Sequence, residues 1–142
     1  EAGWGVFKQH PLGIGLSNVD KFYLNLKSYP GDVSKNRQGH LHDNFLQIAV
    51  ERGILGLAAF LWWLAVLLRL QFRHSAAGSA SKTEDAVFAG ALIAGCFAIT
   101  VSFVVSGVSE YNFGTSMYII IFWFTAGLSV AAAGIAGVKS EK

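Results

Sequence analysis

The sequence predicts an all-α membrane protein, and two observations carry that prediction. Of its 142 residues, 53% are hydrophobic and only 14% are charged, a composition too apolar for an ordinary soluble domain. Residues 53–68, 86–109 and 111–138 contain no Asp, Glu, Lys or Arg, and the last two stretches exceed the roughly 18 residues that a spanning helix needs. We therefore expect a polytopic helical bundle fragment with about three transmembrane helices and an N-terminal periplasmic arm.

The residue pattern divides the chain into seven consecutive segments. Residues 1–44 are polar and rich in turn residues, as in "HPLGIG" and "SYPGD", so they are expected to form an arm outside the membrane. After this arm we expect a transmembrane helix at 45–70, a linker at 71–85, a second helix at 86–109, a turn at 110–114, a third helix at 115–138 and a tail at 139–142. Most basic residues close to the spans flank the linker and the tail, which places these two segments in the cytoplasm and the arm and turn in the periplasm.

Small residues mark the faces expected to pack between helices. Gly53 and Gly56 each lower helix propensity by on the order of 1 kcal/mol relative to Ala, a loss that close packing would offset. We interpret them as a helix-packing motif of the first span. A second small-residue face recurs every four residues along the second span: Ala86, Gly90, Ala94 and Ala98.

Charge and cysteine usage exclude several classes of protein. The net charge of +2 comes without a dense basic run, so nucleic acid is not an expected partner. Cys96 is the single cysteine and lies in an apolar stretch, where it can form neither an intrachain disulfide nor a Cys-based metal site. The chain starts at Glu1 without a signal peptide, and three helices enclose little polar space. We therefore expect an N-terminal transmembrane part, missing from this chain, as its partner.

The stretch "GHLHDNFLQIAVERGILG", residues 39–56, places polar chemistry at the start of the first span. Asn44, Gln47 and Glu51 share one face of the expected helix. Polar groups at membrane depth usually face a bundle interior or a water-filled cavity and are functional candidates. The alternative is that Glu51 and Arg52 lie at headgroup depth and extend their charged ends into water.

Two histidines precede this polar face, and they allow two kinds of chemistry. His40 and His42 alternate as metal ligands on a strand do, but His10 is the one further histidine on that side, so no metal site is predicted. The other option is one histidine acting as general base, since its unperturbed pKa of about 6.5 suits proton transfer at neutral pH. Asp43 or Glu51 could orient that base, and nearby basic residues could hold an anionic leaving group such as a phosphate.

The segment "HLHDNFLQIAVERGILGLAAF" resembles the signature of the O-antigen ligase and O-antigen polymerase superfamily of bacterial inner-membrane glycosyltransferases. The ligase form has a His, then Asn, Ser or Gln, nine residues, and Gly-x-x-Gly. Here His42 is followed by Asp43, the nine residues 44–52, and then Gly53 and Gly56. "HPLGIGLSNV" is similar to the family's Pro-x-Gly-x-Gly turn. Asp43 stands where the ligase signature has Asn, Ser or Gln, so the choice between ligase and polymerase stays open.

The resemblance implies a metal-independent transferase that needs no cofactor and uses an undecaprenyl-diphosphate-linked glycan as donor. His42 would deprotonate the hydroxyl of the acceptor, which is another glycan or a lipid A-core sugar. The site would face the periplasm from a multi-pass protein of the bacterial inner membrane. Basic residues of the arm are the candidates for holding the diphosphate: Arg37, Lys35 and Lys8. The supporting residues around the base would be His40, Asp43, Asn44, Gln47 and Glu51.

A non-enzymatic alternative is a membrane transport or scaffolding module. In that interpretation the polar stripe lines a histidine-lined cavity, and the histidines respond to pH. Replacing His42 distinguishes the two hypotheses, because only the enzyme needs that residue for glycan transfer.

Overall fold

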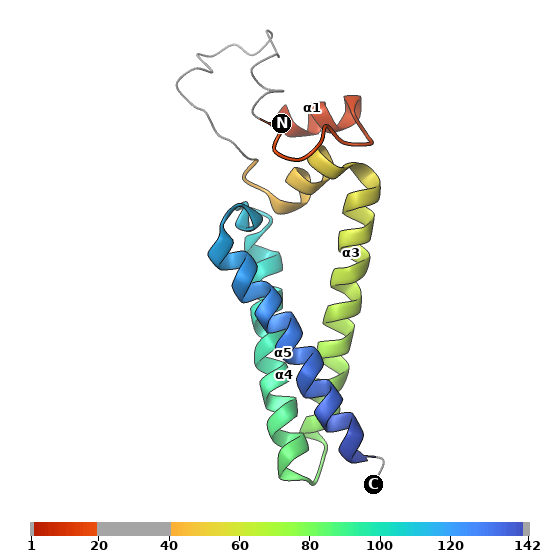
Figure 1. Cartoon of the computed structure of the whole chain (residues 1–142), viewed down its shortest axis with the longest axis vertical. Coiled ribbons are helices and arrows are strands. Elements are labelled where there is room, and N and C mark those ends of the chain that lie inside the picture. The colour runs from red at the N-terminus through yellow and green to blue at the C-terminus, as the bar shows by residue number, and fades with distance from the viewer. Residues whose placement is uncertain (1, 20–40, 141–142) are drawn as a thin grey trace. The chain divides into compact units, whose positions relative to one another are not determined.

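The computed structural model describes the backbone of residues 2–19 and 41–140 (Figure 1). Across these residues the chain is helical and without strands, and three helices are long and apolar enough to cross a membrane, which confirms the predicted all-α class. The elements are α1 (Ala2–Gln9), α3 (Asn44–Ser79), α4 (Glu84–Ser106), the 3-10 helix η1 (Asn112–Gly114) and α5 (Ser116–Ser140).

The chain divides into two compact units. The first unit comprises residues 1–61 and 107–114, and the second comprises residues 62–106 and 115–142. Helix α3 contributes residues to both units. The predicted histidine motif and the turn that follows α4 both belong to the first unit.

Helix α3 is longer than the sequence pattern predicted. It continues to Ser79 and takes up much of the segment 71–85 that was expected to be a linker. The Ser75 hydroxyl donates to the Phe72 carbonyl at 3.0 Å, and the Ser79 hydroxyl donates to the Ser75 carbonyl at 2.9 Å. These serines therefore bond back onto the helix instead of ending it, and alanines between them favour helix. The expectation of a linker starting at residue 71 is corrected accordingly.

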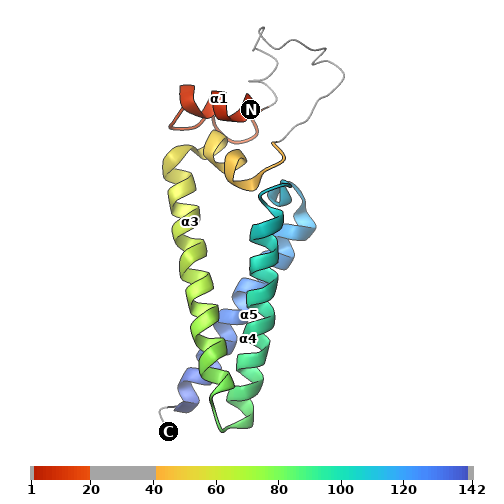
Figure 2. The same ribbon diagram turned by 180° about the vertical axis from the view of Figure 1, so that it is seen from behind.

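The second unit is built on close contact between helices, which Figure 2 shows for the C-terminal part of α3 and the start of α4. A Cβ on Gly90 would lie 2.7 Å from the Gly78 Cα, so the two backbones meet directly. Gly90 thus fulfils the role predicted for the small-residue face, whereas Ala94 and Ala98 are exposed. The buried face of α4 instead consists of Ala89, Gly90, Ile93, Cys96 and Thr100.

A buried amide joins the three long helices inside the second unit. Gln71 Nε2 on α3 donates to Thr100 Oγ1 on α4 and to Ser129 Oγ on α5, each at 3.1 Å. All three side chains are buried. Polar bonds of this kind hold helices together in lipid, where hydrophobic burial gives little preference for helix association.

We predict that Gly90→Ala destabilises the second unit and that Gly95→Ala does not. The added methyl of Gly90→Ala meets the Gly78 backbone, which cannot move aside as a side chain can, and such overpacking costs about 1–3 kcal/mol. Gly95 lies on the same helix, and a Cβ there would have no atom within 4 Å, so alanine should leave stability unchanged or raise it by up to about 1 kcal/mol.

Denaturant unfolding in detergent, followed by tryptophan fluorescence, measures both variants. Trp63 and Trp123 lie in the second unit with ring centroids 4.8 Å apart, so their emission reports its packing. Equal stability of the two variants would contradict a direct backbone contact at Gly90.

Candidate functional site

Asp43 caps the N-terminus of α3 and thereby places His42 immediately outside the helix. Its Oδ1 accepts the backbone N–H of Phe45 at 2.7 Å and that of Leu46 at 3.0 Å. Helices begin with such bonds because their first N–H groups lack partners within the helix, and Asn, Asp and Ser perform this role almost equally well. The capping geometry therefore gives Asp43 a structural role that Asn or Ser could also fill.

Helix α3 is interrupted at Gly53, and the loop after α1 pairs with the interruption. Gly53 has φ 71° and ψ −175°, which a continuous helix does not allow. The carbonyls of Val50 and Glu51 accept the N–H groups of Ile14 at 2.9 Å and Gly15 at 3.0 Å. The Ile54 N–H donates to the Pro11 carbonyl at 2.9 Å. The loop thus satisfies backbone groups that the interruption releases from the helix.

Glycine is required on both sides of this pairing. Gly13 has φ 93°, and a Cβ there would lie 2.6 Å from the Glu51 carbonyl oxygen and 2.6 Å from the Gly53 nitrogen. A Cβ on Gly53 would collide with the backbone of Leu12. Positive φ and close backbone approach are the two conditions that select glycine.

Within the described residues, Gly53 and Gly56 make local contacts, and their predicted helix-packing role stays a prediction. Gly53 meets a loop rather than a helix. A Cβ on Gly56 would collide with the Cβ of Arg52. Arg52 lies on the other side of the interruption at Gly53, which brings its side chain against Gly56. The Gly-x-x-Gly spacing therefore encodes a local break in α3.

The polar stripe of α3 is buried and connects the loop to the residue before His42. Glu51 Oε1 accepts the backbone N–H of Ser17 at 3.0 Å and the Nε2 of Gln47 at 2.8 Å. Gln47 Oε1 in turn accepts the backbone N–H of Leu41 at 2.7 Å. Both side chains are at least nine-tenths buried. The stripe acts as a chain of hydrogen bonds that holds the backbone beside His42.

The turn after α4 docks onto the first residues of α3. The Asn44 N–H donates to the Gly107 carbonyl at 2.7 Å, and the Asn44 Oδ1 accepts the Phe113 N–H at 3.3 Å. The Phe113 ring also packs edge-on against Phe60, with centroids 5.5 Å apart. These contacts hold the segment 107–114 beside the cap of α3.

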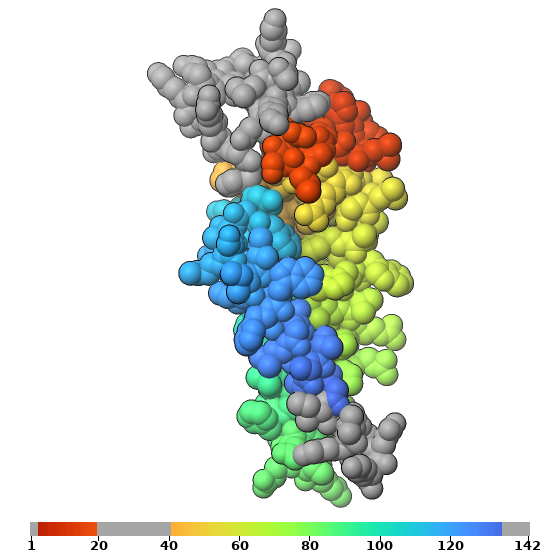
Figure 3. Space-filling view, viewed as in Figure 1, coloured from red at the N-terminus to blue at the C-terminus, as the bar shows by residue number. Residues whose placement is uncertain are grey.

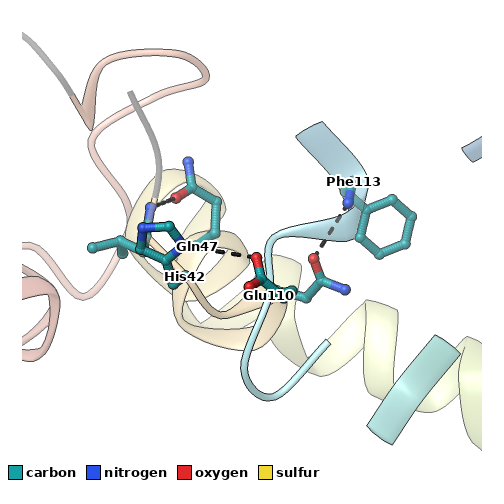
Figure 4. Close-up of polar contacts among 6 residues, drawn as sticks. His42, Gln47, Glu110 and Phe113 are labelled. Atoms are coloured by element: carbon teal, nitrogen blue, oxygen red, sulfur yellow. Dashed lines mark hydrogen bonds and ion pairs between the residues drawn. The ribbon is translucent and has the colours of Figure 1, made fainter. Parts of the chain in front are cut away.

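Docking of this turn brings Glu110 to His42, and Figure 4 shows the two side chains pointing toward each other. His42 Nδ1 lies 3.7 Å from Glu110 Oε2. This separation suits an ion pair with a protonated imidazole and is too long for a direct hydrogen bond. The two side chains are 51% and 66% exposed, so both can meet a substrate.

Tyr111, next to Glu110, adds a neutral hydroxyl to the site. Burial raises the pKa of its phenol above the ordinary value of 10.0, the Glu51 charge raises it further, and the Arg52 guanidinium lowers it. The phenol therefore stays protonated at neutral pH and retains a donor hydrogen. Arg52 itself is exposed.

Apolar side chains of α1, of the loop after it and of α3 pack together next to the site. Val6, Val19 and Val50 form the buried cluster, with Phe7 and Leu46 among the residues packed against it. In the space-filling view of Figure 3, the side chains of α1 lie directly against those of the first turns of α3. The hydrogen bonds of the stripe are therefore shielded from water on this side, which strengthens them.

The remaining predicted residues are placed as follows. Lys8, in the last turn of α1, holds its Nζ 5.6 Å from the Trp4 ring centroid, a cation–π contact. Lys35, Arg37 and His40 lie outside the described residues. Within the described ranges, no three His, Cys, Asp or Glu side chains converge as metal ligands.

Sequence reasoning missed Glu110 and Arg52 as members of this site. The predicted topology placed the turn 110–114 on the same side of the membrane as the arm, which was the available signal for Glu110. Sequence patterns could not indicate the contact, because Glu110 lies far from His42 along the chain. Arg52 was interpreted only as a charge that reaches headgroups, because the break at Gly53 was not foreseen.

Residues 1–61 match the family model described as O-antigen ligase. This segment contains α1, the loop that pairs with α3, the capped start of α3 and the break at Gly53. The match confirms the predicted resemblance of this part of the chain to the O-antigen ligase and polymerase superfamily. No curated protein and no solved structure matches the chain.

We predict that Gly53→Ala disrupts the first unit while Gly5→Ala leaves it intact. Gly53 combines a positive φ with an extended ψ, a conformation that costs a non-glycine residue roughly 1–3 kcal/mol, and the collision with the Leu12 backbone adds to this cost. Gly5 lies in α1, and a Cβ there would have no atom within 4 Å, so its alanine variant is the matched control.

Thermal unfolding in detergent, with limited proteolysis of the segment before α3, measures this effect. Protease should cut the Gly53→Ala variant sooner than the parent protein, because the loop loses its pairing with α3. Equal protection of the two variants would contradict the interlock between the loop and the helix break.

Proposed function

Because residues 1–61 match the O-antigen ligase family, we propose that this chain carries the catalytic histidine of a membrane glycosyltransferase. The enzyme would transfer a glycan from an undecaprenyl-diphosphate carrier to an acceptor hydroxyl. The observation that supports this function most directly is the placement of His42: exposed, outside a capped helix, and facing a carboxylate. Such a placement suits a general base that meets a substrate at the end of a membrane helix.

In this proposal His42 takes the proton of the acceptor hydroxyl through Nε2, the ring nitrogen on the side away from Glu110. The acceptor oxygen then forms a bond to the anomeric carbon of the donor glycan. The bond from that carbon to the carrier's phosphate oxygen breaks, and the undecaprenyl diphosphate leaves with the bonding electrons. Proton transfer of this kind contributes about 10² to 10⁴ to a rate.

Glu110 acts in this proposal as a positioning residue. Its carboxylate would orient the imidazole and stabilise the positive charge that His42 gains when it accepts the proton. At 3.7 Å and with both groups about half exposed or more, the interaction is modest and sensitive to salt. We therefore assign Glu110 a smaller contribution than His42.

The buried stripe supports the proposal by holding the base in place. Gln47 accepts the backbone N–H of Leu41, next to His42, and Glu51 accepts the backbone N–H of Ser17 in the loop after α1. A base must stay within hydrogen-bonding distance of its proton, and a rigid support keeps it there. These buried and paired groups favour a positioning role over the lining of a transport route.

Cations near this site would hold the leaving diphosphate. Arg52 is exposed and belongs to the first unit, so we add it to Lys8, Lys35 and Arg37 as a candidate. Its planar guanidinium can grip phosphate oxygens with two parallel hydrogen bonds. We place the site at the periplasmic face of the bacterial inner membrane, because the basic residues closest to the spans flank the opposite side.

We predict that His42→Ala reduces glycan transfer by about 10²-fold or more, since the acceptor hydroxyl loses its base. His10→Ala is the matched control, because His10 is exposed in the loop of the same unit and outside the proposed mechanism. The assay uses the full-length protein in membranes with a lipid-linked donor, with and without a lipid A-core acceptor.

Both variants should insert into the membrane as the parent protein does, so that a loss of transfer reflects the lost base. Retained transfer by His42→Ala would remove His42 from the role of base. Chain growth without the core acceptor would identify a polymerase, and dependence on the core acceptor would identify a ligase.

We predict that Glu110→Gln lowers the turnover number by about tenfold, a size typical of partners that orient a reacting group. Glu110→Asp keeps the charge and should recover part of the rate. An unchanged turnover number in Glu110→Gln, or no recovery in Glu110→Asp, would contradict the positioning role.

A further inference from the structure

A groove lies along one face of the C-terminal part of α3, in the second unit. Its volume is about 520 Å³. The lining residues recur at intervals of three and four, so they form one continuous stripe of the helix. Among the described residues, those that line it are Val66, Arg69, Leu70, Arg73, His74 and Ala77.

The groove is basic, and its arginines lack acidic partners in the described part of the chain. Arg69 and Arg73 are exposed, and no Asp or Glu of residues 2–19 and 41–134 forms an ion pair with either of them. They lie one helical turn apart, about 6 Å along the axis by the helix rise. Two guanidiniums at that spacing can contact the oxygens of a single phosphate, and His74 adds a third polar group.

The length of the apolar segment places the arginines close to the depth of lipid headgroups. Residues 53–68 carry no charge, and Arg69 is the first charged residue after them. A helix crosses the hydrocarbon core of a bilayer with about 20 residues, and a count from Ile54 along α3 ends near Arg73. The apolar lining residue Val66 lies before the arginines, toward the hydrocarbon.

We propose that this groove binds an anionic phospholipid. Arg69 and Arg73 would hold the phosphate of its headgroup, and Val66 and Leu70 would contact the first part of an acyl chain. A groove that combines two exposed guanidiniums, without acidic partners among the described residues, with an apolar wall matches both parts of such a lipid. Basic pockets beside transmembrane helices recognise anionic headgroups in this way. This inference is independent of the glycan transfer proposed above.

Native mass spectrometry of the full-length protein in detergent tests the proposal. The protein is titrated with phosphatidylglycerol and, separately, with phosphatidylcholine carrying the same acyl chains. We expect phosphatidylglycerol to be retained at about tenfold lower concentration, the preference that one net charge-assisted bond of about 1.4 kcal/mol supplies. Arg69→Gln with Arg73→Gln should abolish the preference.

Controls distinguish the groove from general attraction by positive charge. Lys82→Gln removes an exposed cation close in sequence but outside the groove, so it should keep the preference. Arg69→Lys with Arg73→Lys keeps the charge without the planar fork, and the preference of this double variant should be intermediate. Inorganic phosphate should fail to displace the lipid, because it cannot use the apolar wall.

Four outcomes would overturn the proposal. They are equal retention of the two lipids, full preference after Arg69→Gln with Arg73→Gln, equal loss in Lys82→Gln, or displacement by inorganic phosphate. Retention time on size exclusion and helix content by circular dichroism show that each variant is folded, so a loss of binding cannot be attributed to unfolding.

Discussion

The backbone pairing between the loop after α1 and the break in α3 is the constraint on which the first unit depends. A helix that breaks in a largely apolar segment releases carbonyl and N–H groups that need partners. Here the loop supplies them through Pro11, Ile14 and Gly15. The pairing is close enough that Gly13 and Gly53 must both lack a side chain. The "HPLGIG" motif of the loop and the Gly-x-x-Gly motif of α3 therefore contact each other directly.

The interlock determines what the polar stripe can do. With the loop held against α3, the backbone of Ser17 reaches the Glu51 carboxylate, and Gln47 extends the connection to Leu41. A carboxylate and an amide that would be costly to bury alone are satisfied by fixed donors. The result is a support that leads to His42. The capping carboxylate of Asp43 completes this support at the end of the helix.

The second unit obtains its cohesion from different interactions. Gly78 and Gly90 let two helices approach closely, and the Gln71 amide bonds to both remaining helices. Aromatic rings add to this packing, with Phe103 and Phe122 stacked at 4.3 Å between centroids. In lipid, van der Waals contact and a few buried polar bonds replace the hydrophobic effect as the cause of helix association. The unit can therefore present charged residues of α3 at its surface without loss of its core.

The sequence by itself determined the all-α class, the three apolar helices, the place of His42 just before the first of them and the resemblance to the O-antigen ligase family. These depend on composition, on charge-free length and on short spacings, all of which are local. The capping role of Asp43 is equally local, because its two bonds reach only the next turn, but it differs from the base-orienting role predicted for that residue. The tertiary structure decided the rest. Ser17 and Glu51 are 34 residues apart, and Asn44 and Phe113 are 69 apart, so only the folded chain shows that these pairs meet. It also decided that Gly53 breaks the helix and that Glu110 faces His42. Periodicity predicts which face of a helix is polar, but the partner of that face depends on segments brought together by folding.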